Sequence, residues 1–129
     1  MYPQEFLYTK EHEWIRVDGE IGTIGITDYA QKELGDIVYV ELPKPGEHLT
    51  ATQSFGTVES VKAVSEIYAP VSGEVAAANT KLQNKPEVLN TDPHGEAWLV
   101  QVRLSDRREL EKLMSAEEYE AYIQKEKSA

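Results

Sequence analysis

The Asp18-Gly19 pair most restricts what this chain can form, because it separates two short runs of alternating apolar and polar residues. The runs cover residues 14–17 and 21–27. An Asp-Gly pair between two such runs is typical of a two-residue hairpin turn, since glycine reaches positive φ without strain. We therefore predict that the two runs pair as antiparallel strands.

Two more runs have the period of a strand, residues 36–42 and residues 98–104. In the first of them Val38, Val40 and Leu42 are expected to share one face. Apolar residues also occupy every second position of the later run. The middle of the chain is therefore predicted to be mainly β.

Helix signals are fewer. Thr27 is placed to cap a short helix over residues 28–34, and Gly35 is placed to end it. Two C-terminal helices are predicted from two pairs with capping-box spacing, Asp106 with Glu109 and Ser115 with Glu118. The apolar stripes of these helices are expected to cover the sheet. The predicted fold is mainly β with a short internal helix and C-terminal helices.

Composition limits the function classes. A chain of 129 residues with 40% hydrophobic content suits one compact domain over residues 1–129. Its 13 basic against 23 acidic residues give a formal charge of -10, which opposes binding to nucleic acid or to anionic membranes. No apolar run approaches the roughly 20 residues that span a bilayer, and the first residues lack the features of a leader. A cytoplasmic location is predicted.

Lys62 is the residue with the most chemical interest. It lies among small and apolar neighbours, and the chain has no cysteine, so any thiol chemistry would have to come from an attached group. A primary amine that becomes acylated would supply such a group, whereas the alternative is an ordinary solvated lysine. Apolar residues recur at every third position over 57–67, which suits a helix, but β-branched residues bounded by Gly56 and Pro70 suit a hairpin equally.

Patterns for other chemistries are incomplete. His12 and Glu13 lack the second histidine of a zinc-protease helix, because Arg16 occupies that position. The sequence contains no dinucleotide fingerprint, phosphate-binding loop or nucleophile elbow. Neither a metal site nor an independent catalytic activity is predicted.

Long, ordered segments of the sequence resemble the H protein of the glycine cleavage system. The matching segments are 11–14, 24–30, 34–43, 55–63, 69–75 and 90–99. The resemblance implies a lipoyl/biotinyl-type flattened barrel in which Lys62 lies on a tight turn between two strands. It therefore favours the hairpin over the helix.

The same resemblance implies a carrier without catalytic activity of its own, with lipoate attached covalently to Lys62. Its partners would be glycine decarboxylase (P protein), aminomethyltransferase (T protein), dihydrolipoyl dehydrogenase (L protein) and a lipoate ligase or octanoyl/lipoyl transferase. It would act as a monomer that carries the aminomethyl group of glycine between the P and T proteins. The alternative is a relay protein that donates a lipoyl or octanoyl group to 2-oxo acid dehydrogenase subunits.

Glu13 is the candidate for holding the loaded arm, because a carboxylate suits the cationic amine and Glu13 lies in a matched segment. An exposed surface acid is the alternative interpretation of Glu13. The sequence departs from the pattern of the family at His94, often tyrosine, and at Ala97, often glycine. Glu33 stands where some members have histidine, so no role in docking is assigned to it.

Overall fold

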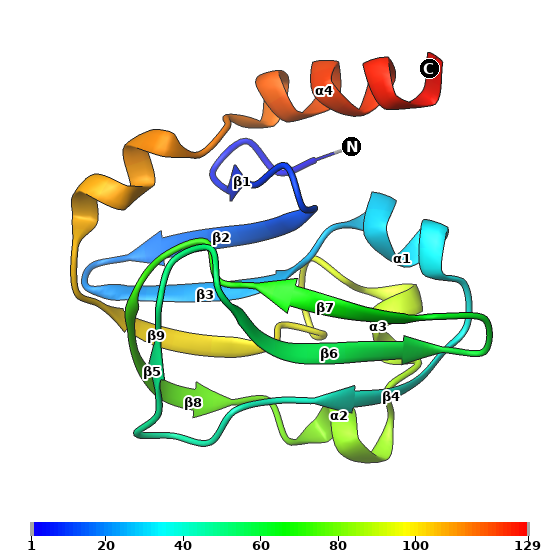
Figure 1. Ribbon diagram of the computed structural model, residues 1–129, viewed down its shortest axis with the longest axis horizontal. Helices are drawn as coiled ribbons and strands as arrows, with labels where there is room; N and C mark the ends of the chain where they lie inside the picture. Colours follow the sequence, from blue (N-terminus) through cyan, green and yellow to red (C-terminus); the bar gives the residue numbers. More distant parts are fainter. Residues whose placement is uncertain (1, 129) are drawn as a thin grey trace.

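The computed structural model describes residues 2–128, in which two antiparallel sheets enclose the core (Figure 1). The larger sheet has six strands in the order β1 (Leu7–Tyr8), β2 (Glu13–Asp18), β3 (Ile21–Ile26), β9 (Val100–Leu104), β8 (Gly73–Ala78) and β5 (His48–Leu49). The smaller sheet has three, in the order β4 (Ile37–Glu41), β6 (Ser54–Ser60) and β7 (Val64–Tyr68). The lipoyl-type fold expected from the resemblance is confirmed.

The first predicted hairpin is confirmed. Asp18 at the end of β2 pairs with Ile21 at the start of β3, so the turn consists of Gly19 and Glu20 and lies one residue later than the predicted Asp18-Gly19 turn. Gly19 has a φ of 65°, in the left-handed region that glycine enters without steric penalty.

The helix α1 (Asp28–Leu34) follows β3 and confirms the predicted caps. The side chain of Thr27 accepts a hydrogen bond from the backbone N–H of Ala30. Gly35 ends the helix with a φ of 83°, and its N–H donates to the carbonyl of Gln31. The caps satisfy backbone groups that a seven-residue helix would otherwise leave unpaired.

The predicted faces of the 36–42 run are partly wrong. A bulge between Ile37 and Tyr39 breaks the register between β4 and β6. Ile37 and Val40 are consequently buried, whereas Val38 and Tyr39 are both about half exposed. An extra residue in one strand reverses the alternation locally, which the period of the sequence does not reveal.

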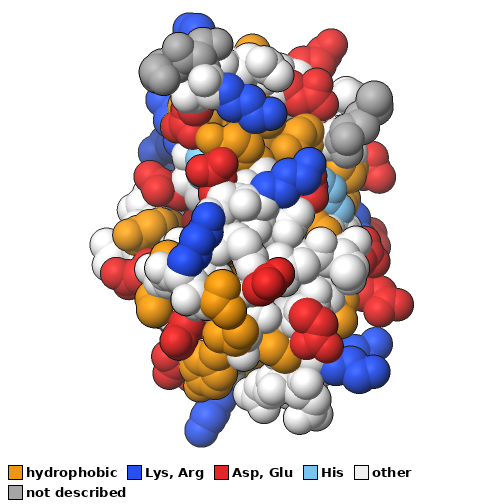
Figure 2. Space-filling view, turned by 90° about the vertical axis from the view of Figure 1, so that its right-hand side faces the viewer, with side chains coloured by type: hydrophobic (Ala, Val, Ile, Leu, Met, Phe, Trp, Pro, Cys, Tyr) orange, Lys and Arg blue, Asp and Glu red, His pale blue; other side chains and the backbone are white. Residues whose placement is uncertain are grey.

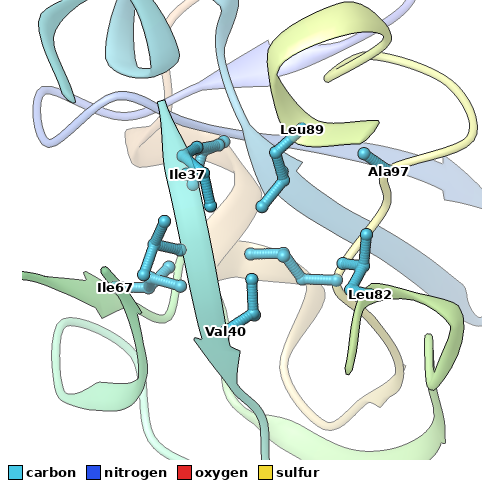
Figure 3. Packing of buried hydrophobic residues seen from close by; sticks show 9 residues of the cluster. Ile37, Val40, Ile67, Leu82, Leu89 and Ala97 are labelled. Carbon is cyan, nitrogen blue, oxygen red and sulfur yellow. The ribbon is translucent and has the colours of Figure 1, made fainter. Parts of the chain in front are cut away.

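The hydrophobic core lies between the two sheets. One cluster joins Ile26 of the larger sheet to Val40, Val58 and Ile67 of the smaller one. Figure 3 shows this cluster, in which Leu82 and Leu89 come from the short helices α2 (Lys81–Asn84) and α3 (Val88–Thr91). The sequence patterns did not predict these two four-residue helices.

The C-terminal segment forms a 3-10 helix (Arg107–Lys112) and the helix α4 (Ala116–Ser128), which lies beside β1 at the top of Figure 1. The Ser115–Glu118 capping box is confirmed, because each side chain accepts from the backbone N–H of the other residue. The expected reciprocal bond of Glu109 is wrong: its carboxylate accepts from the backbone N–H and the hydroxyl of Ser72.

The apolar stripes pack as predicted. Tyr119 and Ile123 of α4 are buried against Tyr8 and Trp14. Leu110 packs partly buried on a second hydrophobic cluster, which includes Ile15, Val75 and Val102 of the larger sheet. Among the described residues, no helix is long and apolar enough to cross a bilayer.

Gly73 provides a test of this packing. A Cβ atom placed on Gly73 would lie 2.2 Å from the carbonyl oxygen of Arg103 on β9, and the φ of Gly73 is not in the left-handed region. We expect Gly73→Ala to lower the free energy of unfolding by about 1–3 kcal/mol, because β8 and β9 would have to separate locally. Urea unfolding measures this change, with exposed Glu74→Ala as the control. Equal stability of the two variants would contradict the close approach.

Candidate functional site

Lys62 lies at the turn between β6 and β7, which form one antiparallel hairpin. Glu59 pairs with Val64, and the backbone N–H of Ser60 donates to the carbonyl of Ala63 at 2.8 Å. The hairpin is therefore confirmed, and the helical alternative for this segment is wrong. The apolar residues at three-residue spacing therefore do not share one face: Val58 and Ile67 are buried in the strands, whereas Val61 and Val64 are exposed at the tip.

Ser60 holds this turn together. Its buried hydroxyl accepts from the backbone N–H groups of Lys62 at 3.3 Å and of Ala63 at 3.1 Å, and donates to the carbonyl of Ala63. Side chains of this kind bond to nearby backbone and favour turns. Ser60 was not among the residues predicted from the sequence, although a serine three residues before the end of a turn is a recognisable signal.

The residues that follow α1 contact the turn that contains Lys62. The N–H of Val61 donates to the carbonyl of Asp36 at 3.0 Å. A Cβ atom on Gly35 would lie 3.4 Å from Cε of Lys62, so the stem of the lysine passes over this glycine. Asn90 on α3 donates to the carbonyl of Gly35 and accepts from the N–H of Ile37, each at 2.9 Å. No local pattern predicts this contact, because 55 residues separate Asn90 from Gly35.

The surroundings of Lys62 are apolar and exposed. The large hydrophobic residues that stand out as exposed in the described chain are Val38 (49%), Tyr39 (51%), Val61 (70%) and Val64 (65%). We call these four residues the apolar patch. They belong to β4, β7 and the turn that contains Lys62, and Figure 2 shows the end of the molecule where that turn lies, with hydrophobic side chains gathered beside acidic ones. Solvent-facing valines and a tyrosine at one place mark a contact surface.

Glu13, at the start of β2, is buried with 2% of its surface exposed, so its interpretation as an exposed surface acid is wrong. Its carboxylate accepts from the hydroxyl of Thr9 at 2.5 Å and from the backbone N–H of Tyr68 at 3.0 Å. Burial raises the pKa of Glu13 to about 7, although both hydrogen bonds oppose the rise. A buried acid in a cavity whose pKa is raised in this way is a candidate for a functional site.

Two cavities are lined in part by residues of β7, and Glu13 lines one of them. The first, of about 300 Å³, is lined by Thr9, Glu11, Glu13, Thr52, Tyr68, Ala69 and Pro70. The second, of about 280 Å³, is lined by Glu11, His12, Tyr29, Ala30, Glu33, Leu34, Ser65 and Glu126. Because Glu11 lines both, we treat them as one feature, the arm groove. Lys62 and Glu13 themselves are not in contact: Lys62 precedes β7, and Glu13 binds the last residue of β7.

The two residues at which the chain departs from the family pattern have structural roles. Nε2 of His94 accepts from the backbone N–H of Asp28 at 3.0 Å, which satisfies a free amide of α1. Ala97 is fully buried in the core between the sheets. Within residues 2–128, no group of three or more histidine and acidic side chains is arranged to hold a metal ion.

Two facing antiparallel sheets with an exposed lysine at the tip of one hairpin are the arrangement expected of a domain that carries a covalently attached group. A family model described as "Glycine cleavage H-protein" matches residues 6–126. The chain therefore belongs to the glycine cleavage H-protein family. Members of this family are the lipoyl carriers of the glycine cleavage system and are not themselves catalytic.

Individual relatives agree with the family model. The glycine cleavage system H protein of Acidobacterium capsulatum is 56% identical over 125 residues, covering 97% of this chain and 96% of the relative. That of Halothermothrix orenii is 52% identical over 122 residues, covering 95% of each chain. The crystal structure of an H protein from Mycobacterium marinum has a TM-score of 0.89 and 37% identity, and the match covers 95% of this chain and 99% of that one.

The raised pKa of Glu13 predicts how stability depends on pH. A buried acid with a raised pKa favours the folded state below its unfolded pKa of 4.5, and that contribution is lost as pH rises through about 7. We expect wild type to lose stability relative to Glu13→Gln between pH 5 and pH 8. The amide keeps the size of the side chain and one acceptor oxygen, but does not titrate.

Urea unfolding of the unmodified proteins at both pH values tests this expectation. Glu20→Gln, in an exposed position, is the control and should show no such difference. A difference between wild type and Glu13→Gln that does not change with pH would mean that Glu13 titrates normally.

Proposed function

We propose that Nζ of Lys62 is the attachment point of the lipoyl group that the family carries. The observation that carries this proposal is the exposed position of Lys62 on a turn that its own backbone and Ser60 hold rigid. Among the described residues, no carboxylate forms a salt bridge with the amine, so an acylating enzyme would not have to break an ion pair. Acylation would remove one positive charge and leave a formal charge of -11.

The chemistry of the lipoyl group determines what the protein itself has to do. A bound lipoyl group supplies a disulfide for redox and group transfer, which this cysteine-free chain lacks. The residues of the chain present the group, exclude water from its cargo and bind partners. We infer that residues 1–129 act as a single carrier domain. Phe55 supports this inference, because it packs against both hydrophobic clusters.

The proposed partners are glycine decarboxylase, aminomethyltransferase and dihydrolipoyl dehydrogenase, together with a lipoate ligase or an octanoyl/lipoyl transferase. Each must approach the Lys62 turn, where the apolar patch offers contact area and Glu59 and Glu66 add charge. A net charge of -10 would steer the carrier toward basic surfaces and make association faster at low salt. A monomer in the cytoplasm stays a prediction.

We further propose that Glu13 holds the cationic aminomethyl cargo at the far end of the arm groove. Tyr68 lies six residues beyond Lys62, which is about 20 Å along a strand. About sixteen bonds separate Cα of Lys62 from an amine on the outer sulfur of a lipoyl group, or roughly 19 Å at the rise of an extended chain. The similar lengths support a loaded arm that lies straight in the groove.

Replacement of the lysine tests the attachment. We expect Lys62→Arg to abolish lipoylation by a ligase, because arginine keeps the positive charge but is not acylated. The free energy of unfolding should change by no more than about 0.5 kcal/mol, since the side chain is exposed. Intact mass and peptide mapping measure the modification, and Lys85→Arg, another exposed lysine, is the matched control. A lipoylated Lys62→Arg protein would refute the assignment.

Replacement of Glu13 tests the docking of the cargo. Glu13→Gln should weaken the docked state by about 1–3 kcal/mol, because a charge-assisted hydrogen bond to the amine becomes a neutral one. The loaded variant should then release ammonia and formaldehyde at least about fivefold faster than wild type. Lipoylation and reoxidation by the flavin enzyme should stay normal. Exposed Glu5→Gln is the control, and equal decay of the Glu13 variant and wild type would remove Glu13 from the mechanism.

A further inference from the structure

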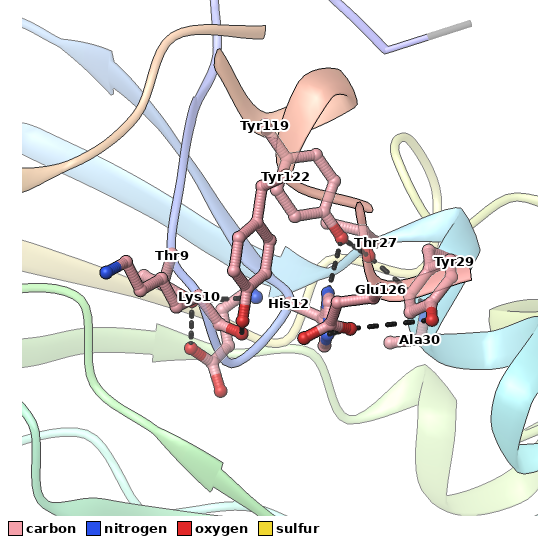
Figure 4. Close-up of polar contacts among 10 residues, drawn as sticks. Thr9, Lys10, His12, Thr27, Tyr29, Ala30, Tyr119, Tyr122 and Glu126 are labelled. Carbon is pink, nitrogen blue, oxygen red and sulfur yellow. Dashed lines mark hydrogen bonds and ion pairs between the residues drawn. The ribbon is translucent and has the colours of Figure 1, made fainter. Parts of the chain in front are cut away.

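A chain of polar contacts runs from the core to the edge of the arm groove (Figure 4). The hydroxyl groups of Thr27 and Tyr119, both fully buried, are 2.7 Å apart. The hydroxyl of Tyr119 is 2.8 Å from Nδ1 of His12, and Nε2 of His12 is 3.3 Å from a carboxylate oxygen of Glu126. The chain therefore connects α1, α4 and the turn before β2.

The hydrogen bonds of this chain can all be donated in one direction, from Thr27 through Tyr119 and His12 to Glu126. A carboxylate can only accept a hydrogen bond, so the proton in the contact between His12 and Glu126 lies on Nε2 of His12. Burial lowers the pKa of His12 and favours the neutral ring, whose Nδ1 then accepts. Burial raises the pKa of Tyr119, so its hydroxyl keeps a proton and donates it to Nδ1. The hydroxyl of Thr27 donates to Tyr119 while accepting the N–H of Ala30.

Glu126 occupies a particular place in the groove. Tyr29 and Glu33 from α1 line one part, Ser65 of β7 lines another, and Glu126 is the contribution of α4. The hydroxyl of Tyr29 is a second contact of the Glu126 carboxylate, at 3.5 Å. The end of α4 thus contributes one acidic side chain to the lining of the groove, which we call the wall.

We propose that Glu126, fixed by His12, is a positioning residue that retains the loaded arm in the groove. This inference rests on the proposed path of the arm from Lys62 to Glu13. Burial lowers the pKa of His12 and so favours the neutral ring, and no lysine or arginine forms a salt bridge with Glu126 among the described residues. None of the residues that line the groove in the described chain is a lysine or arginine. The wall therefore favours an arm with a cationic end over an arm with a neutral disulfide.

The tautomer of His12 is the first test and needs no attached group. Long-range ¹⁵N–¹H spectra of the unmodified protein at neutral pH should show a neutral His12 ring with the proton on Nε2. The same spectrum of Glu126→Gln should show a shifted Nε2, because the acceptor loses its charge. A proton on Nδ1 of His12 in wild type would overturn the proposal.

Decay of the loaded protein is the second test. Glu126→Gln should release ammonia and formaldehyde about two- to fivefold faster than wild type, whereas the rate at which a small thiol reduces the oxidised arm should not change. Glu117→Gln is the matched control, because it removes the same charge from an exposed position on α4. Decay of Glu126→Gln at the wild-type rate, or equal acceleration in Glu117→Gln, would overturn the role of Glu126. A purely structural role would change both the decay and the reduction of the arm.

Glu13→Gln, measured in parallel, separates the two proposals. If the loaded arm decays faster in Glu13→Gln but at the wild-type rate in Glu126→Gln, the role of Glu126 is refuted and the proposal for Glu13 remains. Unchanged decay in both variants would refute both.

Discussion

Burial of the three-stranded sheet against the larger sheet is the constraint on which the rest of the structure depends. Val40, Val58 and Ile67 each project from the smaller sheet into the core, one from each strand. A lone two-stranded hairpin is marginally stable in water. Because the base of the β6–β7 hairpin is held by this core, its tip is free to expose Lys62 without a hydrophobic anchor of its own.

The same arrangement explains why an apolar patch and an exposed lysine occur together. The bulge in β4 turns Val38 and Tyr39 toward solvent while Ile37 and Val40 remain in the core. Large exposed hydrophobic residues would normally favour aggregation, but here they lie on β4, β7 and the turn that contains Lys62. The family assignment gives this surface a purpose, since a carrier needs brief contacts with several proteins.

The acidity of the chain has two separate roles. Exposed carboxylates give a long-range field, which salt would weaken. Glu13 is different, because it is enclosed, paired with Thr9 and Tyr68, and titrates near neutrality. Glu126 is exposed, but its carboxylate contacts Nε2 of His12 and the hydroxyl of Tyr29. In our proposal, a groove lined by carboxylates and by no lysine or arginine favours a cationic cargo over a neutral one.

The sequence by itself determined the local elements, because turn and cap chemistry act over a few residues. The Asp18-Gly19 hairpin, the caps of α1 and the Ser115–Glu118 box followed from such patterns. Resemblance over long segments indicated the family and singled out Lys62 and Glu13, whereas the periodicity around Lys62 alone suited helix and hairpin equally. Only the tertiary structure decided what depends on residues far apart in the chain. It buried Glu13, placed Asn90 beneath the lysine turn and brought α4 to the groove, since burial and these contacts arise from the packing of distant segments.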